Sequence, residues 1–593
     1  MARTQQAGQS LRAGRIVPAG DAALLVRLGS RPGPSASRRA LALVAALDAT
    51  PPSGIVDVVP AYASFLVRFD PLVCEPAAMA AFLRTMLAQS ADTPPSHGRL
   101  IRIPVHYGGS DGPDLDEVAR LLGMTTAEVI QRHVAASYRV AFLGFLAGYP
   151  YLSGLPRALA VPRLATPRTR VPAGSVAIAE RQAGVYPVSS PGGWRILGRT
   201  SLPLFDPQRD PPALLSPGDW VRFIPVAADE LPDPPSPKHQ AIAAPDATGA
   251  PWLRVVQPGL QATVQDSGRL GYARYGVSAS GAADPDALAL GNALLANPPD
   301  AAALEITGGA ASFEALEASV VAVTGAPCHV SVKGRRVAPG VSFALEPGDL
   351  LEIGAPSSGL RVYLAAASGV TVPRVMGSRA TDLRAGLGGL FGRPLRAGDE
   401  LARGPVCDEV AGRVLPPDMM SRLPGGDAYE WRLRIVPGPH AQESPGADTL
   451  DALLRARFTV DPRSDRVGVR LRRVDDLDGM NGPCLEGGQT LSEGLPRGAV
   501  QLPPDGEPVV LLADAQATGG YHVPAVVISA DLWRIGQLRP GAMVRFERVS
   551  LAEALAALRS RRDEIAAVRR SPLPARLQGG FAEWSEDNDD DGE

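Results

Sequence analysis

Apolar residues in the first hundred positions follow two different spacings. Some segments alternate or run without interruption, as strands do, and others repeat every three to four residues, as helices do. The strand-like segments are 22–29, 55–70 and 99–107, and the helix-like segments are 37–49 and 75–90. This succession predicts a small α+β unit of ferredoxin-like type over 16–96, after a polar tail at 1–15 that we expect to be disordered.

Two short helices precede a long region of short strands. Asp114 and Thr125 each stand three residues before a glutamate, a capping arrangement that predicts helices at 115–122 and 126–136. Beyond them, short β-type runs lie between Gly and Pro residues. That pattern favours a β-barrel.

An internal repeat is visible in the sequence. Three segments recur in the same order, and their matched pairs are 171–178 with 495–502, 182–186 with 516–521 and 215–223 with 538–546. The repeat predicts two related barrels and places Gln182 opposite Gln516. A weaker relative of the last segment, at 344–354, predicts a third barrel.

The chain is therefore expected to be α+β and mainly β, with an N-terminal ferredoxin-like unit followed by three barrels. A segment rich in Pro, Ala and Asp at 228–251 has little to bury and is expected to be a linker. The predicted boundaries are 97–227, 252–404 and 405–549 for the barrels and 550–593 for a C-terminal helix with an acidic tail.

Charge and cysteine use narrow the function classes. The 593 residues include 59 basic and 62 acidic side chains, so no electrostatic footprint for nucleic acid or an anionic membrane is visible. No run of about 20 apolar residues predicts a membrane span. The four cysteines form no C-x-x-C pair and no signal peptide is visible, so we expect a reducing cytoplasm. No His or carboxylate cluster has metal spacing, so we expect no metal.

Lys238 and Lys333 are the only lysines. A P-loop, a biotin attachment turn and a Ser-Lys amidase each need a lysine in a particular motif, and neither lysine stands in one. We therefore expect no P-loop, no biotin attached to this chain and no amidase chemistry.

Two long motif regions carry a resemblance to known proteins. The first reads RVAFLGFLAGYPYLSGLP at 139–156 and extends to residue 200; the second comprises VQDSGRLGYARYGVSASGAADPDAL at 264–288 and LLADAQATGGYHVPAVVISADL at 511–532. The first resembles the KipI-like module, an allophanate hydrolase subunit 1 type also found as component B of bacterial 5-oxoprolinase. The second resembles the KipA-like module, the subunit 2 type, which is component C of the same enzyme. Both are similar to the carboxyltransferase region of urea carboxylase. The resemblance implies cyclophilin-like barrels and a fusion of two polypeptides.

Glutamines and Gly-rich loops in these motifs supply candidate binding residues. Gln182 and Gln516 offer a donor and an acceptor, as a lactam or urea-like group requires, and capping of a barrel turn explains them equally well. Gly192 and Gly193 leave backbone amides open for an anion. Trp194 is either a lid or a core residue. Further substrate contacts are expected from Tyr186, Ser190, Arg199, Thr518, Gly519 and Gly520.

The second motif region adds charged candidates. Gln265, Asp266 and Arg269 share a turn, in which Arg269 suits bidentate recognition of a carboxylate; a surface ion pair is the alternative. Glu305 is expected to be buried, where a raised pKa would suit acid/base work unless an arginine pairs with it. Ser280 precedes a helix capped by Asp284, whose start is either an anion site or simply a helix end.

Two further residues have structural explanations of their own. Asn292 lies at the edge of the apolar stripe of the helix that follows Asp284, where it points towards a neighbour. His133 stands among apolar residues at the end of the second short helix and is expected to be a packed core histidine.

By resemblance, the chain is expected to act in ATP-dependent opening of 5-oxoproline to glutamate, with Asp266, Glu305 and Gln516 as catalytic candidates. A separate 5-oxoprolinase component A of the LamB/YcsF type and ATP, with or without Mg²⁺, are implied, and self-association is left open. The alternatives are the carboxyltransferase component of a biotin-dependent urea or amide carboxylase, and a KipI-like regulator of a histidine kinase.

The chain departs from the family pattern at four positions. Ala147, Glu180, Ala183 and Ala283 stand where the family usually has Pro, Gly, Thr and Met. These changes alter loop rigidity and remove a hydroxyl at position 183.

Overall fold

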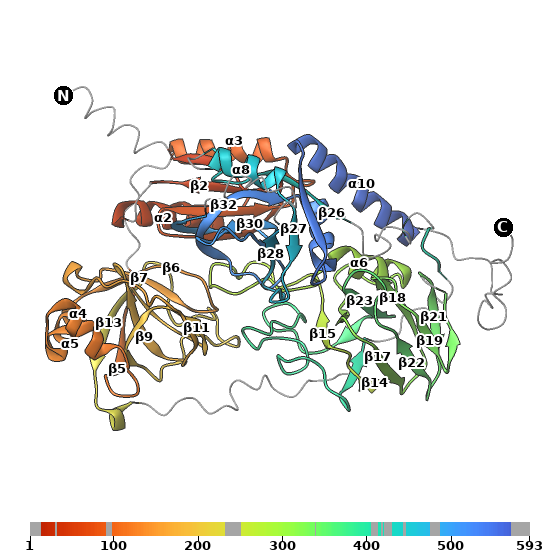
Figure 1. Cartoon of the computed structure of the whole chain (residues 1–593), viewed down its shortest axis with the longest axis horizontal. Helices are drawn as coiled ribbons and strands as arrows, with labels where there is room; N and C mark the ends of the chain where they lie inside the picture. The colour runs from red at the N-terminus through yellow and green to blue at the C-terminus, as the bar shows by residue number, and fades with distance from the viewer. Residues whose placement is uncertain are drawn as a thin grey trace.

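Four β-rich units make up the computed structural model of the chain (Figure 1). The residues described are 14–29, 33–89, 98–231, 251–338, 340–404, 413–416, 419, 430–442, 446–474 and 487–570. Most of the predicted linker, at 232–250, and the predicted tails at 1–13 and 571–593 lie outside them.

The N-terminal unit is an antiparallel four-stranded sheet with two helices on one face. Its elements are β1 (Arg15–Pro18), β2 (Ala23–Arg27), α2 (Pro34–Ala49), β3 (Ile55–Pro60), β4 (Ser64–Phe69) and α3 (Pro76–Gln89). The helices bury an apolar stripe against alternate residues of β2 and β4. The predicted succession of strands and helices is present, but the strand order is β1-β2-β4-β3. The sheet gains its additional strand, β1, before β2 and not after α3, so the ferredoxin-like arrangement is not confirmed.

The second unit is a closed ring of seven strands in the order β10-β7-β6-β13-β5-β12-β9. Its elements are β5 (Leu100–Tyr107), α4 (Leu115–Leu122), α5 (Thr126–Ala135), β6 (Tyr138–Leu143), β7 (Pro150–Ser153), η1 (Arg157–Leu159), β8 (Arg168–Val171), β9 (Ser175–Ala179), β10 (Gln182–Val185), β11 (Ser190–Gly192), β12 (Arg195–Arg199), β13 (Trp220–Pro225) and η2 (Ala228–Glu230). The short strands β8 and β11 pair beside the ring. The first predicted barrel is therefore confirmed.

The two predicted helix starts differ in their caps. Thr125 accepts a hydrogen bond from the Glu128 amide and forms the expected capping box. Asp114 does not cap α4, because its carboxylate accepts hydrogen bonds from Arg168 at 2.6 Å and from the Ile196 amide at 2.7 Å. The local pattern predicted the helix correctly, but the Asp114 side chain forms an ion pair with a distant residue instead of capping the helix.

The C-terminal unit repeats the seven-strand ring. Its elements are β26 (Glu430–Pro437), α8 (Gly446–Arg455), β27 (Phe458–Val460), β28 (Gly468–Arg473), β29 (Gln489–Gly494), β30 (Ala499–Leu502), β31 (Val509–Leu511), β32 (Thr518–Val527), η4 (Ser529–Asp531), α9 (Leu532–Gln537), β33 (Met543–Arg548) and α10 (Leu551–Arg570). Pairing of β26 with both β33 and β32 closes the ring, and β29 extends it beside β32. In both rings the first strand pairs in parallel with the last, β5 with β13 and β26 with β33.

Strand order corrects one part of the predicted repeat. The order β10-β9-β12-β5-β13 matches β31-β30-β32-β26-β33, so the outer two of the three sequence matches are confirmed. Gln182, at the start of β10, corresponds to the start of β31, whereas Gln516 lies just before β32. The true counterpart of the Gly-Gly-Tyr at 519–521 is the Gly-Gly-Trp at 192–194, which precedes β12. The two glutamines are not equivalent.

The unit between the rings contains two sheets packed face to face instead of a third closed barrel. One has the order β20-β19-β22-β17-β14-β25-β24 and the other β15-β16-β23-β18-β21. Its elements are β14 (Pro251–Gln257), β15 (Gln261–Gln265), α6 (Pro285–Leu294), β16 (Ala303–Thr307), β17 (Ala311–Ala315), β18 (Ser319–Gly325), β19 (Val330–Val332), β20 (Arg335–Arg336), β21 (Ser342–Leu345), β22 (Leu350–Ile353), β23 (Arg361–Ala366), β24 (Val370–Thr371) and β25 (Glu400–Arg403). The segment at 344–354, which suggested a barrel, instead connects β21 of one sheet with β22 of the other.

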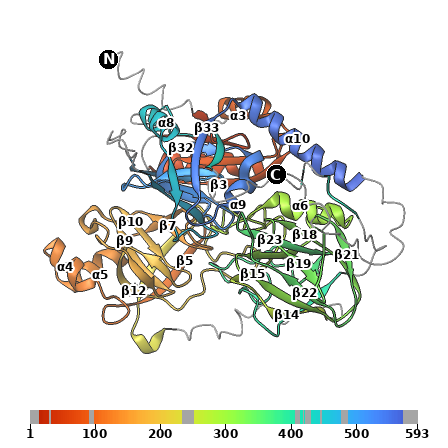
Figure 2. The same ribbon diagram turned by 45° about the vertical axis from the view of Figure 1, so that its right-hand side comes forward.

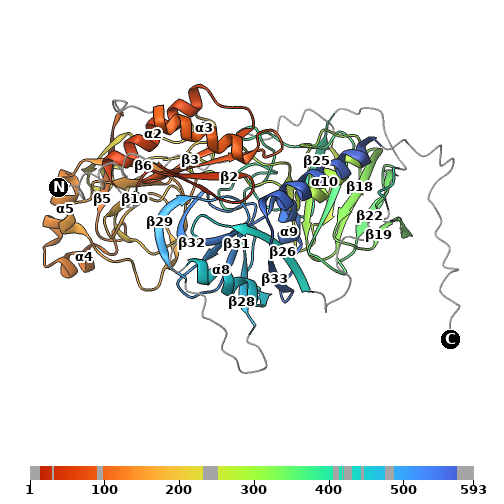
Figure 3. The ribbon, with the colours of Figure 1, turned by 90° about the horizontal axis from the view of Figure 1, so that it is seen from above.

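Contacts between units bring distant parts of the chain together at the centre. The face of the N-terminal sheet opposite its helices lies against the C-terminal ring, where Arg27 pairs with Glu493 at 2.7 Å (Figure 3). The long helix α10 crosses α6, and Arg561 on α10 pairs with Asp286 on α6 (Figure 2). Among the helices described, none is long and apolar enough to cross a membrane.

Candidate active site

Arg466 is the centre of a buried ion cluster between the middle unit and the C-terminal ring. It lies just before β28 and donates two hydrogen bonds to Asp514 at 3.0 Å and another to Glu305 on β16. All three side chains are at most 5% exposed. Burial opposes the charged form of Arg466, but the two carboxylates outweigh it and raise the pKa of the guanidinium.

Asp514 also holds the loop that precedes α6. The Ser280 hydroxyl donates to Asp514 at 2.9 Å, and Arg466 donates to the Gly281 carbonyl at 2.7 Å. Ser280 has a φ of 53°, a left-handed conformation that is costly for a residue with a Cβ. Gly281 is also left-handed, and a Cβ there would lie 2.8 Å from the Gly268 nitrogen. The loop therefore keeps a strained turn that the ion cluster fixes.

Glu305 is a paired carboxylate, so the predicted raised pKa is wrong. Its oxygens accept hydrogen bonds from Tyr363 at 2.6 Å and from the Ala283 amide at 2.8 Å, in addition to Arg466. Desolvation raises its pKa, but Arg466, Arg361 and these hydrogen bonds outweigh burial and lower it. Pairing with arginine, the alternative left open by the sequence, is what the structure has.

The same network continues to the N-cap of α6. Tyr363 accepts a hydrogen bond from the Asp284 amide at 2.8 Å, and the Asp284 carboxylate accepts bonds from Ala287 and Gln537. Burial, with the nearby Asp286 carboxylate, raises the pKa of Asp284 to about 7. Asp284 is therefore a group in this region whose charge changes near neutral pH.

A cavity of about 80 Å³ lies beside the ion cluster. Its wall is formed by the loop at 267–280, by residues 495–497 before β30, by residues of 512–517 after β31, and by the N-terminal sheet. Polar groups on that wall include Ser267, Ser280, Gln516, Arg497 and Arg68. Gln516 thus lies where the sequence suggested, at a cavity, while Gln182 is not among the residues that line it.

The turn after β15 has a structural role. Asp266 accepts hydrogen bonds from the Gly268 amide, the Ser378 hydroxyl and the Arg379 amide at 2.6–2.8 Å. Gln265 is fully buried and donates to Thr263 and to the Thr381 carbonyl. These contacts tie the loop at 375–381 to the strand.

Arg269 is 1% exposed and donates to the Val375 and Ala380 carbonyls. Desolvation lowers its pKa, opposed by Asp382, Asp266 and Asp514. It does not line the central cavity, so neither the predicted open carboxylate contact nor the surface ion pair describes it.

The candidates in the first ring form an aromatic cluster instead of an open anion site. Tyr186 packs edge-on against Tyr149, and Trp194 is 6% exposed and packs against Tyr149 and Tyr151. The Trp194 amide donates to the Tyr186 hydroxyl, and burial raises the pKa of Tyr186 to about 12. A Cβ at Gly192 would lie 2.3 Å from that hydroxyl. Trp194 is therefore a core residue, and the Tyr186 hydroxyl lies against Gly192, one of the two glycines whose amides were expected to bind an anion.

The remaining predicted residues are spread over the molecule. Asn292 donates to the Ala301 carbonyl and fixes the turn after α6. Arg199, near half exposed, donates to the Ala173 carbonyl. Ser190 is buried, and its hydroxyl lies 3.3 Å from the Pro191 carbonyl. Gly193 lies against Pro167.

At the start of β32, Thr518 contacts the first ring. A Cβ on Gly144 would lie 2.0 Å from the Thr518 hydroxyl oxygen, so only glycine permits that approach. Gly519 and Gly520 allow β32 to pack closely against Leu495 and the Thr490 carbonyl. These three residues position the Gln516 loop between the rings.

Sequence reasoning missed three members of the cluster. Asp514 stands inside the quoted motif LLADAQATGG, which was a signal that could have found it. Arg466 and Tyr363 lie outside the quoted motifs, and only the fold brings them to Glu305.

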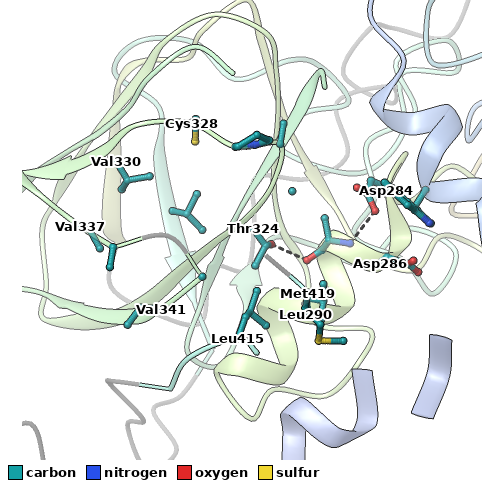
Figure 4. A pocket seen from close by; sticks show the side chains of 18 of the residues that line it. Asp284, Asp286, Leu290, Thr324, Cys328, Val330, Val337, Val341, Leu415 and Met419 are labelled. Carbon is teal, nitrogen blue, oxygen red and sulfur yellow. Dashed lines mark hydrogen bonds between the residues drawn. The ribbon is translucent and has the colours of Figure 1, made fainter. Parts of the chain in front are cut away.

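A second cavity, of about 120 Å³, lies between α6 and the middle unit (Figure 4). Its lining is mainly apolar, and Thr324 donates to the Ala287 carbonyl on one side of it. None of the predicted site residues lines it. Of these two cavities, the central one is therefore the better candidate for the active site.

Two family models cover both halves of the chain. The carboxyltransferase domain, subdomain C and D, matches residues 14–215, and the carboxyltransferase domain, subdomain A and B, matches residues 275–548. Component C of the 5-oxoprolinase of Escherichia coli K12 is 37% identical over 310 residues, which cover 51% of this chain and 94% of that protein. The chain belongs to this carboxyltransferase-domain family.

Other relatives extend the match to the N-terminal half. Component B of the 5-oxoprolinase of Bacillus subtilis is 37% identical over 223 residues, which cover 36% of this chain and 93% of that protein. A urea amidolyase of Lachancea kluyveri is 31% identical over 317 residues, but these are only 17% of that protein. The crystal structure of TTHA0988 is 37% identical with a TM-score of 0.76 and covers 88% of this chain and 99% of that one. The chain is thus a fused module with one part like component B and one part like component C.

Proposed function

We propose that the chain combines components B and C of an ATP-dependent 5-oxoprolinase, which opens the lactam of 5-oxoproline to glutamate. The observation that carries the proposal is that one chain matches both kinds of relative over nearly their whole length, 94% of component C and 93% of component B. The proposed partner is a separate component A of the LamB/YcsF type, and the proposed compartment is the cytoplasm.

The central cavity supports a role in holding the substrate. The Gln516 amide offers both a donor and an acceptor to a lactam carbonyl and N–H, and Arg497 and Arg68 make the wall positive. Asp514, Arg466 and Glu305 lie behind the wall and fix it, since a fully paired buried network costs little reorganisation during a reaction.

The central cavity, with a volume of about 80 Å³, offers little room for a nucleotide, and neither lysine stands in a P-loop motif. We therefore derive no step through ATP on this chain, and we place its use in the complex with component A.

A reconstitution assay separates this proposal from its rival, the carboxyltransferase component of a biotin-dependent urea or amide carboxylase. The chain is mixed with a 5-oxoprolinase component A, ATP and 5-oxoproline, and glutamate is measured with and without avidin and bicarbonate. We expect glutamate release that is insensitive to both. Turnover that requires bicarbonate and is blocked by avidin would instead support the rival.

A further inference from the structure

Arg497 is partly buried beside the central cavity and differs from the buried Arg466 in having no carboxylate partner among the described residues. It lies just before β30, and one guanidinium nitrogen donates to the Ala282 and Ala283 carbonyls at 3.0 and 2.6 Å. Its Nε is buried and has no hydrogen-bond partner in the described part of the chain. By contrast, Arg466 has two carboxylates.

Partial burial makes this arrangement unfavourable for the ligand-free protein. Desolvation, together with the nearby Arg466 and Arg68 cations, lowers the pKa of Arg497 to about 10. Tyr363 and Glu305 oppose this effect, but Arg466 and Arg361 already share the Glu305 carboxylate. A buried cation without a counter-ion is unfavourable unless something else supplies the negative charge.

The position of Arg497 indicates which kind of anion could serve as its counter-ion. Its side chain lines the central cavity, together with Arg68, the Ser267 hydroxyl and the Gln516 amide. Two guanidinium groups on one wall, with neutral donors beside them, are suited to a carboxylate. The cavity volume of about 80 Å³ fits such a head group.

We infer that Arg497 is the specificity-determining residue of the central cavity and that it binds the carboxylate of a small acid ligand, which serves as its counter-ion. The identification of that acid as 5-oxoproline rests on the proposed function. Arg269, the arginine expected from the sequence, is excluded from this role because it does not line the cavity and donates to backbone carbonyls.

Binding to the full chain alone, without ATP or component A, tests the inference. Calorimetric titrations compare 5-oxoproline, its neutral amide and inorganic phosphate on the wild type and on Arg497→Gln. We expect the wild type to bind the acid at least about tenfold more tightly than the amide, and to bind phosphate more weakly than the acid. Arg497→Gln should bind acid and amide alike. A variant that keeps the wild-type preference, or a wild type that prefers phosphate, would overturn the carboxylate assignment.

Two further substitutions of Arg497 and one control variant separate binding from loop support. Arg497→Met removes the charge and the two carbonyl contacts, and we expect its melting temperature to equal or exceed that of the ligand-free wild type, because a partly buried charge without a carboxylate partner is lost. A merely structural Arg497 would give a lower melting temperature. Arg497→Lys, which keeps the charge, should recover part of the preference for the acid. Arg472→Gln, the control, removes the charge of an exposed arginine that pairs with Asp461 and should leave binding unchanged.

The failure of this inference is distinguishable from failure of the proposed function. If the complex with component A releases glutamate and Arg497→Gln leaves the KM for 5-oxoproline unchanged, the carboxylate assignment is wrong and the function stands. If the wild-type complex releases no glutamate but the chain still binds the acid through Arg497, the function is wrong and the site stands.

Discussion

The Ser280 hydroxyl donates to the Asp514 carboxylate at 2.9 Å, across 234 residues of chain and across the boundary between the middle unit and the C-terminal ring. This bond joins the two segments of the second motif region, because Ser280 lies in GVSASGAADP and Asp514 in LLADAQATGG. It fixes a left-handed residue in the wall of the central cavity. The motifs are thus parts of one site.

Substitutions at Ser280 separate the hydroxyl from the backbone conformation. Ser280→Ala removes the hydroxyl and keeps the strain, whereas Ser280→Gly removes both and gains about 1 kcal/mol of backbone relief. We expect Ser280→Gly to be the more stable variant by thermal melting and both to lose kcat/KM by about tenfold in the reconstituted complex. Full activity in Ser280→Gly would show that only the backbone conformation matters.

Arg466→Met tests the buried ion cluster. It leaves Asp514 and Glu305 buried without their main partner, which costs roughly 3–5 kcal/mol. We expect the melting temperature to fall by several degrees, measured by calorimetry. The matched control is Arg463→Met, which removes an exposed arginine that pairs with Asp461 and should melt closer to the wild type than Arg466→Met does. Equal melting of both variants would mean that the cluster adds nothing to stability.

The two glutamines should behave differently because only Gln516 lines the cavity. Gln516→Ala removes a hydrogen bond worth about 0.5–1.5 kcal/mol, so kcat/KM should fall roughly two- to tenfold with unchanged folding. Gln182→Ala should cost less. The comparison uses steady-state kinetics of the reconstituted complex. Equal losses in two folded variants would contradict the placement of the substrate at Gln516.

His133 should make the chain sensitive to mild acid. It is fully buried, as expected for a core histidine, and burial lowers its pKa from 6.5 to about 3. Below pH 6.5 the unfolded chain therefore binds a proton that the folded chain does not, and stability falls by up to about 1.4 kcal/mol per pH unit until the pH approaches the folded pKa.

The measurement is the melting temperature of the wild type and of His133→Gln between about pH 7.5 and about pH 4.5. The wild type should lose more stability than the variant as the pH falls below 6.5. If the two melting curves against pH run parallel, protonation of His133 does not differ between the folded and unfolded chain, and the prediction is wrong.

Local patterns predicted much of the fold because they act over few residues. The helix at 115–122 was predicted with its observed bounds, and two of the three repeat matches lie on equivalent strands. The middle match, of 182–186 with 516–521, failed because residue similarity alone paired Gln182 with Gln516, whereas hydrogen-bonded strand order decides equivalence. The prediction of a third barrel was wrong for a related reason. The turn pattern at 344–354 can connect two strands of one sheet or two strands of different sheets, and here it connects β21 and β22 of different sheets.

The site was harder to predict because its members are far apart in sequence. Glu305 and Arg466 are separated by 161 residues, and Arg466 and Asp514 by 48. Nothing in the local sequence shows which arginine meets which carboxylate. Burial and the partners together set the pKa of each group, so the pKa of Glu305 followed its partners rather than its depth.

The central claim is that this chain supplies the B and C parts of a 5-oxoprolinase, and the most direct measurement is of coupled products. The chain, a separate component A, ATP and 5-oxoproline are combined, and glutamate and ADP are quantified together, with each protein omitted in turn. We predict that both products form in equal amounts and only when both proteins are present. Glutamate formed by component A without this chain, or no glutamate from the complete mixture, would contradict the claim.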